Sequence, residues 1–366
     1  MDALRSPHLY NIMYNTKSQS TNTSKSALAA VSGGIDSAVA AMLAQRDGLD
    51  CTGVTMILHS HNSSGEADAR RTVERLGIPF QVFDFCDSFK TCVIDRFVET
   101  YSEGRTPNPC VICNKLIKFG CLMEKMFELK RNYIVTGHYA QIVQNASGRF
   151  LLKKGADILK DQSYVLYGLT QQQLSHIKFP LGGLSKGQVR EIAYEAGLAD
   201  ASKRESQDIC FVPDGDYAGF IEEYTGKSTR KGRFVSPDGK YLGENMGIIH
   251  YTVGQRRGLG LAMPAPVYVL DIQPEDDTVI VGASDLLYSR SLRINDINLI
   301  SADRLDSPVK AHVKIRYRQP GQPAVVRQSS DDTIEIEFDE PQRAITRGQA
   351  AVIYDGDIVV GGGTII

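Results

Sequence analysis

The sequence predicts an α/β protein in which an N-terminal doubly wound parallel sheet is followed by a small central domain and a C-terminal all-β barrel. Three observations predict this class. Apolar runs alternate with helical segments in the first half of the chain, a strand–glycine turn–helix unit opens that alternation, and short alternating strands take over from about Leu292. We divide the chain into a flexible tail (1–25), a catalytic domain (26–211), a central domain (212–286) and a barrel (287–366).

The first unit begins with the apolar run Ala27–Val31, which suits a buried parallel strand. It leads into Ser32-Gly33-Gly34-Ile35-Asp36-Ser37, and the Ala-rich stretch from Ala38 to Gln45 favours a helix. Glycines let backbone N–H groups approach a phosphate, and the positive end of the helix dipole favours negative charge there. The loop lacks the Gly-Lys-Ser/Thr ending of a Walker A motif. It predicts an anion site, and the alternative interpretation is a purely structural tight turn.

Further strand and helix signals alternate after this loop. They are the strands Thr52–Leu58, Phe80–Phe85 and Tyr133–Ala140 and the helical stretches Glu66–Leu76 and Val93–Tyr101. Ligands of such sheets bind beyond the carboxyl ends of the strands. We therefore expect the glycine loop, Met56 and the pair Gly137-His138 to lie on one rim.

A cysteine pair follows two prolines in the stretch Thr106–Lys115. The prolines predict an extended approach, and the sequence after Pro109 is compatible with a helix. Cys110 and Cys113 would then share one face of the first turn, where a helix N-terminus is expected to lower the pKa of a thiol. The alternative interpretations are a buried cysteine pair and half of a structural zinc site. A third cysteine, Cys210, lies in an apolar setting, where a lone thiol is usually inert.

The rest of the chain changes character. Gly187–Ala196 and Gly215–Tyr224 are expected to be helices, and glycine-punctuated strands, including Gly247–Gly258, follow them. The expected barrel strands are Val309–Arg318, Ala324–Arg327, Thr333–Phe338 and Ala350–Tyr354. Short strands with turn signals between them indicate a small barrel or sandwich, and recognition is its expected role.

The net charge of −2 predicts no polyanion partner, but its distribution is informative. Between Lys227 and Arg257 there are seven basic residues and two acidic ones, and a second run consists of Lys310, Lys314, Arg316 and Arg318. Either run alone would be read as a solvated face. Two runs in a chain with nucleotide-site features favour a phosphate-rich partner.

Seven cysteines, an odd number, and the lack of a secretory apolar region predict a reducing compartment, which we take to be the cytoplasm. No apolar run approaches the roughly 18 residues of a membrane span. We therefore expect no association with a membrane.

Seven motifs, in order, resemble the tRNA-specific 2-thiouridylase family of the ATP-pyrophosphatase (PP-loop) superfamily. They are SGGIDS (32–37), GRTPNPCVICNKLIKFG (104–120), TGHYA (136–140), KDQSY (160–164), SQDICFVPDGDY (206–217), YTVGQRRGLG (251–260) and KIRYR (314–318). The resemblance covers essentially everything after the tail. It implies that residues 26–211 form the PP-loop domain and that the central domain contacts RNA.

The resemblance implies an enzyme that adenylates the C2 oxygen of the tRNA wobble uridine with ATP and Mg²⁺ and then replaces that oxygen with sulfur. By this reading Cys210 would carry a persulfide, delivered by a sulfur-donor protein. Cys113 would be the second catalytic thiol and would form a disulfide with Cys210 as sulfur is released. Asp36 would lie near Mg²⁺. The expected ATP-binding residues are Ala30, Val31, Ser32, Gly33, Gly34, Ile35, Asp36, Ser37, Met56 and Gly137.

The resemblance also implies a set of contacts to tRNA, and the target base has to leave its stack for C2 to be reached. Asn108, Pro109 and Cys110 would border that base. The further tRNA contacts are expected at His138, Lys160, Asp161, Gln162, Arg316, Tyr317 and Gln349.

One position departs from the family pattern. Many members carry an aspartate where this chain has Cys110, so we assign no acid/base role there. Cys110, Cys113 and Cys210 could instead be the ligands of a [4Fe-4S] cluster that carries the sulfide, an alternative that we rank below the persulfide route. Two other functions stay open at this point. One is another ligase of the PP-loop superfamily, and the other is a non-catalytic, nucleotide-responsive RNA-binding protein.

Overall fold

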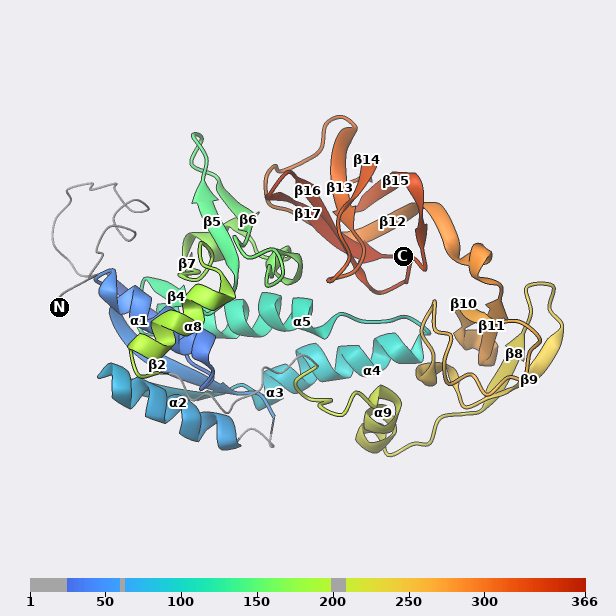
Figure 1. Ribbon diagram of the computed structural model, residues 1–366, viewed down its shortest axis with the longest axis horizontal. Helices are drawn as coiled ribbons and strands as arrows, with labels where there is room; N and C mark the ends of the chain where they lie inside the picture. Colours follow the sequence, from blue (N-terminus) through green and yellow to red (C-terminus); the bar gives the residue numbers. More distant parts are fainter. Residues whose placement is uncertain (1–24, 60–62, 199–208) are drawn as a thin grey trace, which may run out of the picture.

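The computed structural model describes residues 25–59, 63–198 and 209–366, so the tail and Ser206–Asp208 of the third cysteine motif lie outside the described residues. Three sheets organise the chain (Figure 1). An N-terminal sheet of five strands, a second sheet of four strands and a C-terminal sheet of eight strands follow one another along the sequence. The predicted fold class is confirmed by this arrangement.

The N-terminal sheet is parallel throughout and has the order β3-β2-β1-β4-β7. Its strands are β1 (Ser26–Ala30), β2 (Asp50–Ile57), β3 (Phe80–Asp84), β4 (Tyr133–Val135) and β7 (Ile177–Lys178). The chain leaves β1 toward β2 on one side and returns to β4 on the other, so the direction of winding reverses between β1 and β4. A doubly wound sheet opens its ligand crevice at that reversal.

Alternate residues of β1 face two helical layers, as the strand period of two requires. Ala27 and Ala29 pack against α1, α2 and α8, whereas Leu28 belongs to the cluster on the other face. The helices of the first layer are α1 (Ile35–Arg46), α2 (Ser63–Leu76) and α8 (Lys186–Glu195). Those of the other are α3 (Cys86–Phe89), α4 (Asp95–Ser102), α5 (Pro109–Ile112), α6 (Leu122–Glu128) and α7 (Gln171–Ser175).

Two π-helical segments interrupt the second layer. They are η1 (Lys90–Ile94), between α3 and α4, and η2 (Cys113–Cys121), between α5 and α6. A π-helix closes its turn at the fifth residue instead of the fourth and is frequently found at functional sites. The residues 109–128 therefore form one continuous cysteine helix, α5–η2–α6, whose middle is π-helical.

The central sheet has the order β10-β11-β8-β9. Its strands are β8 (Gly232–Val235), β9 (Tyr241–Asn245), β10 (Tyr268–Gln273) and β11 (Thr278–Gly282), and α9 (Tyr217–Thr225) precedes them. The prediction of strand structure within Gly247–Gly258 is wrong. Ile248–His250 forms a single 3₁₀ turn, η4, and Gly247, Gly254 and Gly258 all have positive φ, which breaks a strand.

The C-terminal strands close into a six-stranded antiparallel barrel, because β12 pairs with both β15 and β17. The strands are β12 (Tyr288–Leu299), β13 (Val309–Lys314), β14 (Gln322–Ser330), β15 (Thr333–Arg343), β16 (Ala350–Asp355) and β17 (Ile358–Ile365). The hairpin β5 (Ala140–Gln144) and β6 (Phe150–Lys154) extends this sheet from β17. The strand predicted to run to Arg318 ends at Lys314, so Arg316 and Tyr317 lie in the following turn.

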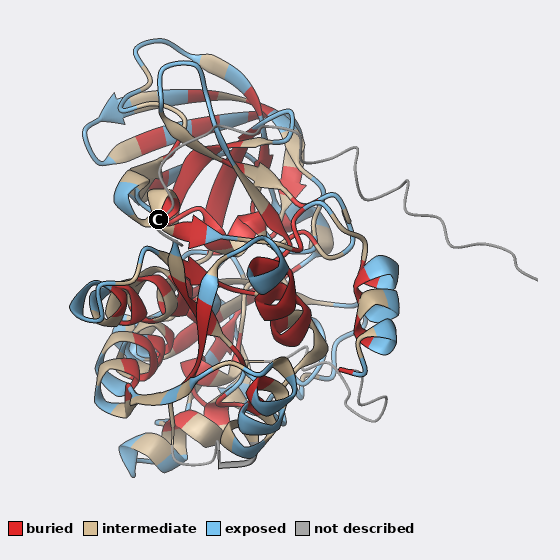
Figure 2. Cartoon of the chain, turned by 90° about the vertical axis from the view of Figure 1, so that its left-hand side faces the viewer, coloured by how far each residue is buried: buried red, intermediate tan, exposed pale blue. Residues whose placement is uncertain are grey.

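Short 3₁₀ segments complete the described elements: η3 (Ser163–Leu166), η5 (Pro274–Asp276) and η6 (Ser284–Leu287). Buried segments fill the N-terminal sheet layer and the interior of the barrel (Figure 2). The domain boundaries at 212 and 287 stay a prediction. None of the helices in the described ranges combines the length and the apolar character that a membrane crossing requires.

Candidate active site

The glycine loop lies at the reversal between β1 and β4. Ala30 ends β1, and the N–H of Val31 still donates to the carbonyl of Val54 on β2. The hydroxyl of Ser37 accepts from the N–H of Ser32 at 3.1 Å and donates to the carbonyl of Gly34 at 2.9 Å. These bonds fix the loop before any ligand is bound. Gly34 caps α1 without a side-chain bond, so the N–H groups of the first turn stay available to an anion.

Two glycines of the rim have no room for a side chain. A Cβ on Gly33, which has φ +75°, would lie 2.3 Å from Cβ of Asp68. A Cβ on Gly137 would lie 2.8 Å from the carbonyl carbon of Asp36 and 2.9 Å from the nitrogen of Ser37. The loop after β4 therefore packs directly on the glycine loop. Met56, near the end of β2, lies on the same sheet edge, as expected.

The carboxylate of Asp36 is held by two residues that our sequence interpretation missed. Nζ of Lys186 lies 2.7 and 2.8 Å from its two oxygens, and the hydroxyl of Tyr139 donates to it at 2.8 Å. Lys186 is the first residue of α8, a capped helix that the sequence predicts only from Gly187 onward. The signal available in the sequence was a lysine directly after the capping serine, Ser185, at a helix N-terminus. Lys186 brings a buried cation to the mouth of the glycine loop.

The cysteine helix begins as the sequence predicts. Asn108 is its N-cap and accepts from the N–H of Val111 at 3.4 Å, and Pro109 occupies the first helical position. Cys110 is exposed and Cys113 is buried. The π-helix η2 starts at Cys113 itself.

The three thiols converge, but the expectation of a lowered pKa at the helix N-terminus is wrong. Burial is the largest influence and raises the pKa of Cys113 to about 11. Burial likewise raises the pKa values of Cys110 and Cys210, which are exposed by area but surrounded by protein. Cys113 also interacts electrostatically with Cys110 and Cys210, which places the third cysteine beside the pair. The positive charge of Lys118 acts on all three thiols in the opposite direction.

Cys210 is positioned by its neighbour Phe211. The Phe211 ring packs edge-on against Phe89 and Phe97, at centroid distances of 5.7 and 5.2 Å, and lies 5.3 Å from Phe220. Phe211 thus lies in an aromatic cluster between α3, α4 and α9. Because Cys210 directly precedes Phe211 in the chain, this packing fixes the position of Cys210.

The thiols do not make a metal site as they stand. Within residues 25–59, 63–198 and 209–366, no three histidine, cysteine, aspartate or glutamate side chains are arranged so that they could hold a metal ion. The three cysteines are near enough for Cys110 and Cys210 to raise the pKa of Cys113 further. A cluster held by the three thiols stays an alternative hypothesis.

The barrel is hydrogen-bonded to the extended segment that precedes the cysteine helix. Nε2 of Gln349 donates to the carbonyls of Thr106 and Pro107 at 3.1 and 3.0 Å, and the N–H of Thr106 donates to the carbonyl of Arg347. Gln349 was expected to contact tRNA. Its side chain instead bonds the cysteine loop here, and a tRNA contact at this residue stays a prediction.

The other predicted tRNA residues fall into two groups. Tyr317 is 38% exposed and interacts electrostatically with Cys110 and Asp161, so it lies at the thiols. Lys160 is half-buried in the adjacent loop. Other members of the set are bonded inside the protein, which suits positioning of the loops better than direct contact. These residues are His138, Asp161, Gln162 and Arg316.

Each of these inward residues has definite partners. Asp161 accepts from Gly155 and Ser163, and Gln162 accepts from the N–H of Tyr139. Arg316 donates to the carbonyl of Ala344 at 3.0 Å. His138 is buried between two aromatic rings. Burial, with a smaller contribution from Lys118, lowers its pKa well below its ordinary value, so its imidazole is neutral.

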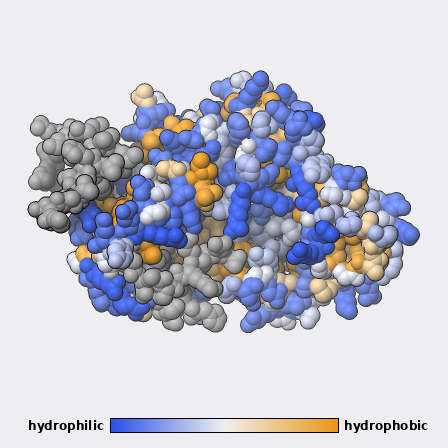
Figure 3. Space-filling model, viewed as in Figure 1, coloured by the Kyte–Doolittle hydropathy of each residue, from blue (hydrophilic) through white to orange (hydrophobic). Residues whose placement is uncertain are grey.

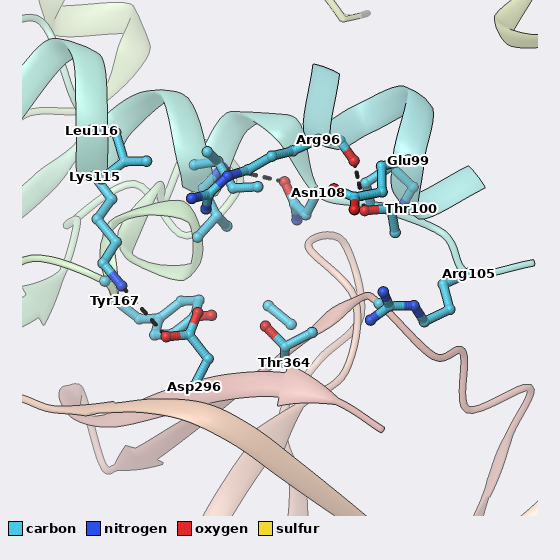
Figure 4. Close-up of a pocket in the computed structure, with 16 residues that line it drawn as sticks. Arg96, Glu99, Thr100, Arg105, Asn108, Lys115, Leu116, Tyr167, Asp296 and Thr364 are labelled. Carbon is cyan, nitrogen blue, oxygen red and sulfur yellow. Dashed lines mark hydrogen bonds and ion pairs between the residues drawn. The ribbon is translucent and has the colours of Figure 1, made fainter. Parts of the chain in front are cut away.

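A recess of about 610 Å³ lies behind the cysteine helix, between α4 and the barrel (Figure 4). Arg96, Arg105 and Asn108 line it, and Lys115 reaches across it toward Asp296, at 3.8 Å. The face of the molecule shown in Figure 3 is hydrophilic over much of the barrel, with hydrophobic groups near the hairpin β5–β6 and over the central sheet.

Comparison with known proteins assigns each part of the chain to a family. Residues 25–214 match the family model described as "tRNA methyl transferase HUP domain", residues 218–283 match "tRNA methyl transferase PRC-barrel domain", and residues 289–365 match "Aminomethyltransferase beta-barrel domain". The tRNA-specific 2-thiouridylase MnmA of Clostridioides difficile (strain 630) is 46% identical over 353 residues, which cover 93% of this chain and 98% of that protein. The tRNA-specific 2-thiouridylase MnmA 1 of Thermoanaerobacter sp. (strain X514) is 47% identical over 349 residues, covering 92% of this chain and 96% of that protein.

Proposed function

The chain belongs to the tRNA-specific 2-thiouridylase family, and from that premise we propose how its site carries out the ATP-dependent thiolation of tRNA. The enzyme binds ATP and acts as a tRNA sulfurtransferase. The proposal concerns the residues that do this, the base they act on and the form in which sulfur arrives. It includes a cytoplasmic location, because free thiols persist only in a reducing compartment.

One observation carries the proposal: a single short loop links the glycine loop to the thiols. Gly137 packs on Asp36 and Ser37, and the next residue, His138, packs against Phe119 of the cysteine helix. His138 also interacts with Lys118, which in turn interacts with all three thiols. An oxygen activated by ATP over the glycine loop would therefore lie near the sulfur nucleophiles.

In the first step the C2 oxygen of the wobble uridine attacks the α-phosphorus of ATP, pyrophosphate leaves, and N3 loses its proton. The glycine loop, from Ser32 to Ser37, would hold the phosphates with its backbone N–H groups and serine hydroxyls. Lys186 would transfer its pairing from Asp36 to the phosphates. The step turns the uracil oxygen into part of a good leaving group, AMP.

Mg²⁺ suits this loop. It takes one or two carboxylates together with the phosphates of a nucleotide, and Asp36 is the carboxylate that the loop offers. When bound, the ion would neutralise charge on the phosphates. Asp36 would have to exchange Lys186 for it, which is consistent with the transfer of Lys186 to the phosphates.

In the second step the outer sulfur of a persulfide on Cys210 adds to C2, and AMP leaves with the oxygen. The thiolate of Cys113 then attacks Sγ of Cys210 and breaks the sulfur–sulfur bond to the base. The electron pair stays on the sulfur at C2, and N3 regains a proton to give 2-thiouridine. A Cys113–Cys210 disulfide remains, which an external dithiol would reduce. A sulfur-donor protein would load the persulfide.

The persulfide route is preferred to the cluster because three cysteines do not by themselves indicate a metal. Anaerobic purification followed by iron and sulfide analysis separates the two. Iron-free protein that thiolates tRNA from a persulfide donor supports our proposal, and activity that appears only with stoichiometric iron and sulfide contradicts it.

The decisive experiment combines the protein, unmodified tRNA transcript, ATP and a persulfide donor. We expect 2-thiouridine at the wobble position by nucleoside mass spectrometry, with release of AMP and pyrophosphate. In Cys210→Ser we expect pyrophosphate release without thiolation. Full thiolation by this variant would overturn the role of Cys210, and tRNA binding without AMP release would indicate a non-catalytic RNA-binding protein.

A further inference from the structure

The π-helix η2 brings a lysine to the side of the cysteine helix that carries Cys113. In an α-helix, Lys118 would be turned by about 140° from Cys113, because five residues at about 100° each exceed one turn. In a π-helix the turn closes at the fifth residue, so Lys118 stands about one turn beyond Cys113 and on its face. The π-helical turn thus places Lys118 on the same face of the helix as the Cys113 thiol.

The charges around the thiols are unbalanced in favour of Lys118. Its positive charge favours the ionised form of Cys110 and Cys113 on its own helix and of Cys210 from another segment. In the described part of the chain no carboxylate forms an ion pair with it, whereas Lys115 of the same helix faces Asp296 in the recess behind. The neighbouring His138 is neutral and supplies no charge.

We propose that Lys118 is the counter-cation of the sulfur chemistry: its ammonium group holds the negative charge of the thiolate formed at Cys113 and of the persulfide anion formed at Cys210, with Cys110 beside them. The use of this charge in catalysis rests on the proposed function. The positive potential of Lys118 at the thiols does not depend on that function. Lys118 acts through the sulfur atoms and is therefore a positioning residue. The substrate of the site is thus an anionic sulfur species that the protein itself carries.

The test compares two alkylating reagents of nearly equal size, anionic iodoacetate and neutral iodoacetamide, at the exposed Cys110 and Cys210. The alkylation rate at each cysteine is measured by peptide mass spectrometry. The ratio of the iodoacetate rate to the iodoacetamide rate reports the local electrostatic potential. In Lys118→Met we expect this ratio to fall about fivefold, as loss of one charge a few ångströms away in a water-like medium predicts. Lys118→Arg should retain the ratio of the unsubstituted protein.

The matched control is Lys115→Met, which removes the same charge from the opposite side of the same helix and should leave the ratio unchanged. If the ratio of the iodoacetate rate to the iodoacetamide rate is unchanged in Lys118→Met, even where both rates fall, the proposal is wrong. Single-turnover thiolation should fall in Lys118→Met and be restored in Lys118→Arg. If even the unsubstituted protein makes no 2-thiouridine, the proposed function fails, while the alkylation ratio still decides the placement of the charge.

Discussion

The ion pair between Lys186 and Asp36 is the closest charge contact at the mouth of the glycine loop, with both oxygens within 2.8 Å of Nζ. Lys186 is nearly buried and Asp36 is partly exposed, so removing the charge of Lys186 by mutation leaves the Asp36 carboxylate without this partner. In Lys186→Met we expect tRNA-dependent pyrophosphate release to fall by about 100-fold, the usual loss for one preorganised charge contact. Lys178→Met, which removes an exposed lysine from β7, is the control. Equal rates in the two variants would exclude Lys186 from the adenylation step.

At the residue scale, burial outweighs the helix N-terminus at Cys113. A helix dipole contributes roughly 0.3–1 kcal/mol at an exposed site, less than the 1.36 kcal/mol of one pKa unit, whereas burial can shift a pKa by several units. The sequence showed the cysteine at a helix start but not how deeply it would be buried. The motif therefore located the residue correctly and gave the wrong sign for its pKa.

The raised pKa of Cys113 leads to a pH prediction. With a pKa of about 11 instead of 9.0, the thiolate fraction below pH 9 is about 100-fold lower than for an ordinary cysteine. Alkylation of Cys113 by iodoacetamide should keep rising tenfold per pH unit beyond pH 9, and levelling near pH 9 would contradict this. In the unfolded chain the Cys113 thiol has its ordinary pKa and loses its proton at a lower pH than in the folded protein. The free energy of unfolding should therefore decrease as the pH rises from 9 to 11.

At the scale of the elements, the contact between the β4 loop and the glycine loop depends on Gly137. A Cβ there would meet backbone atoms of Asp36 and Ser37 at less than 3.0 Å, and neither can rotate away. In Gly137→Ala we expect a displaced loop and a KM for ATP raised by tenfold or more, with a native circular dichroism spectrum. Gly183→Ala, where no heavy atom lies within 4 Å of the added Cβ, is the matched control. Unchanged ATP kinetics in Gly137→Ala would contradict the close approach.

The elements that could be predicted from sequence are those marked by an apolar run, an Ala-rich stretch or an amphipathic pattern. The strands β1 to β3 and the helices α1, α2 and α8 were found within three residues, whereas the strand predicted over Tyr133–Ala140 ends at Val135. The π-helix η2 was not predictable, since its residues are compatible with an ordinary helix and only tertiary packing selects the wider turn. The pairing of β6 with β17 joins segments some 200 residues apart, which local patterns do not reveal.

At the scale of the whole molecule, the barrel fixes the segment of the N-terminal sheet domain that precedes the cysteine helix. The two bonds from Gln349 to Thr106 and Pro107 join β16 to the extended approach of the cysteine helix. Gly348, with φ +87°, has no room for a side chain, because its Cβ would lie 2.9 Å from the carbonyl oxygen of Thr106. The barrel therefore has a structural role in addition to the recognition role that its sequence predicts. It sets the position of the loop that would border the target base.

The last prediction separates these two roles of the barrel. Gln349→Ala removes both bonds to the loop, at a cost of about 1 kcal/mol each, and Gln328→Ala removes one bond to Leu305 within the barrel. If the link positions the loop, Gln349→Ala should slow single-turnover thiolation at saturating tRNA by tenfold or more, with ATP binding unchanged, because a misplaced base costs rate and not affinity. Gln328→Ala should lower only the melting temperature. If Gln349→Ala weakens tRNA binding and leaves the saturated rate intact, the side chain serves RNA contact instead of positioning the loop.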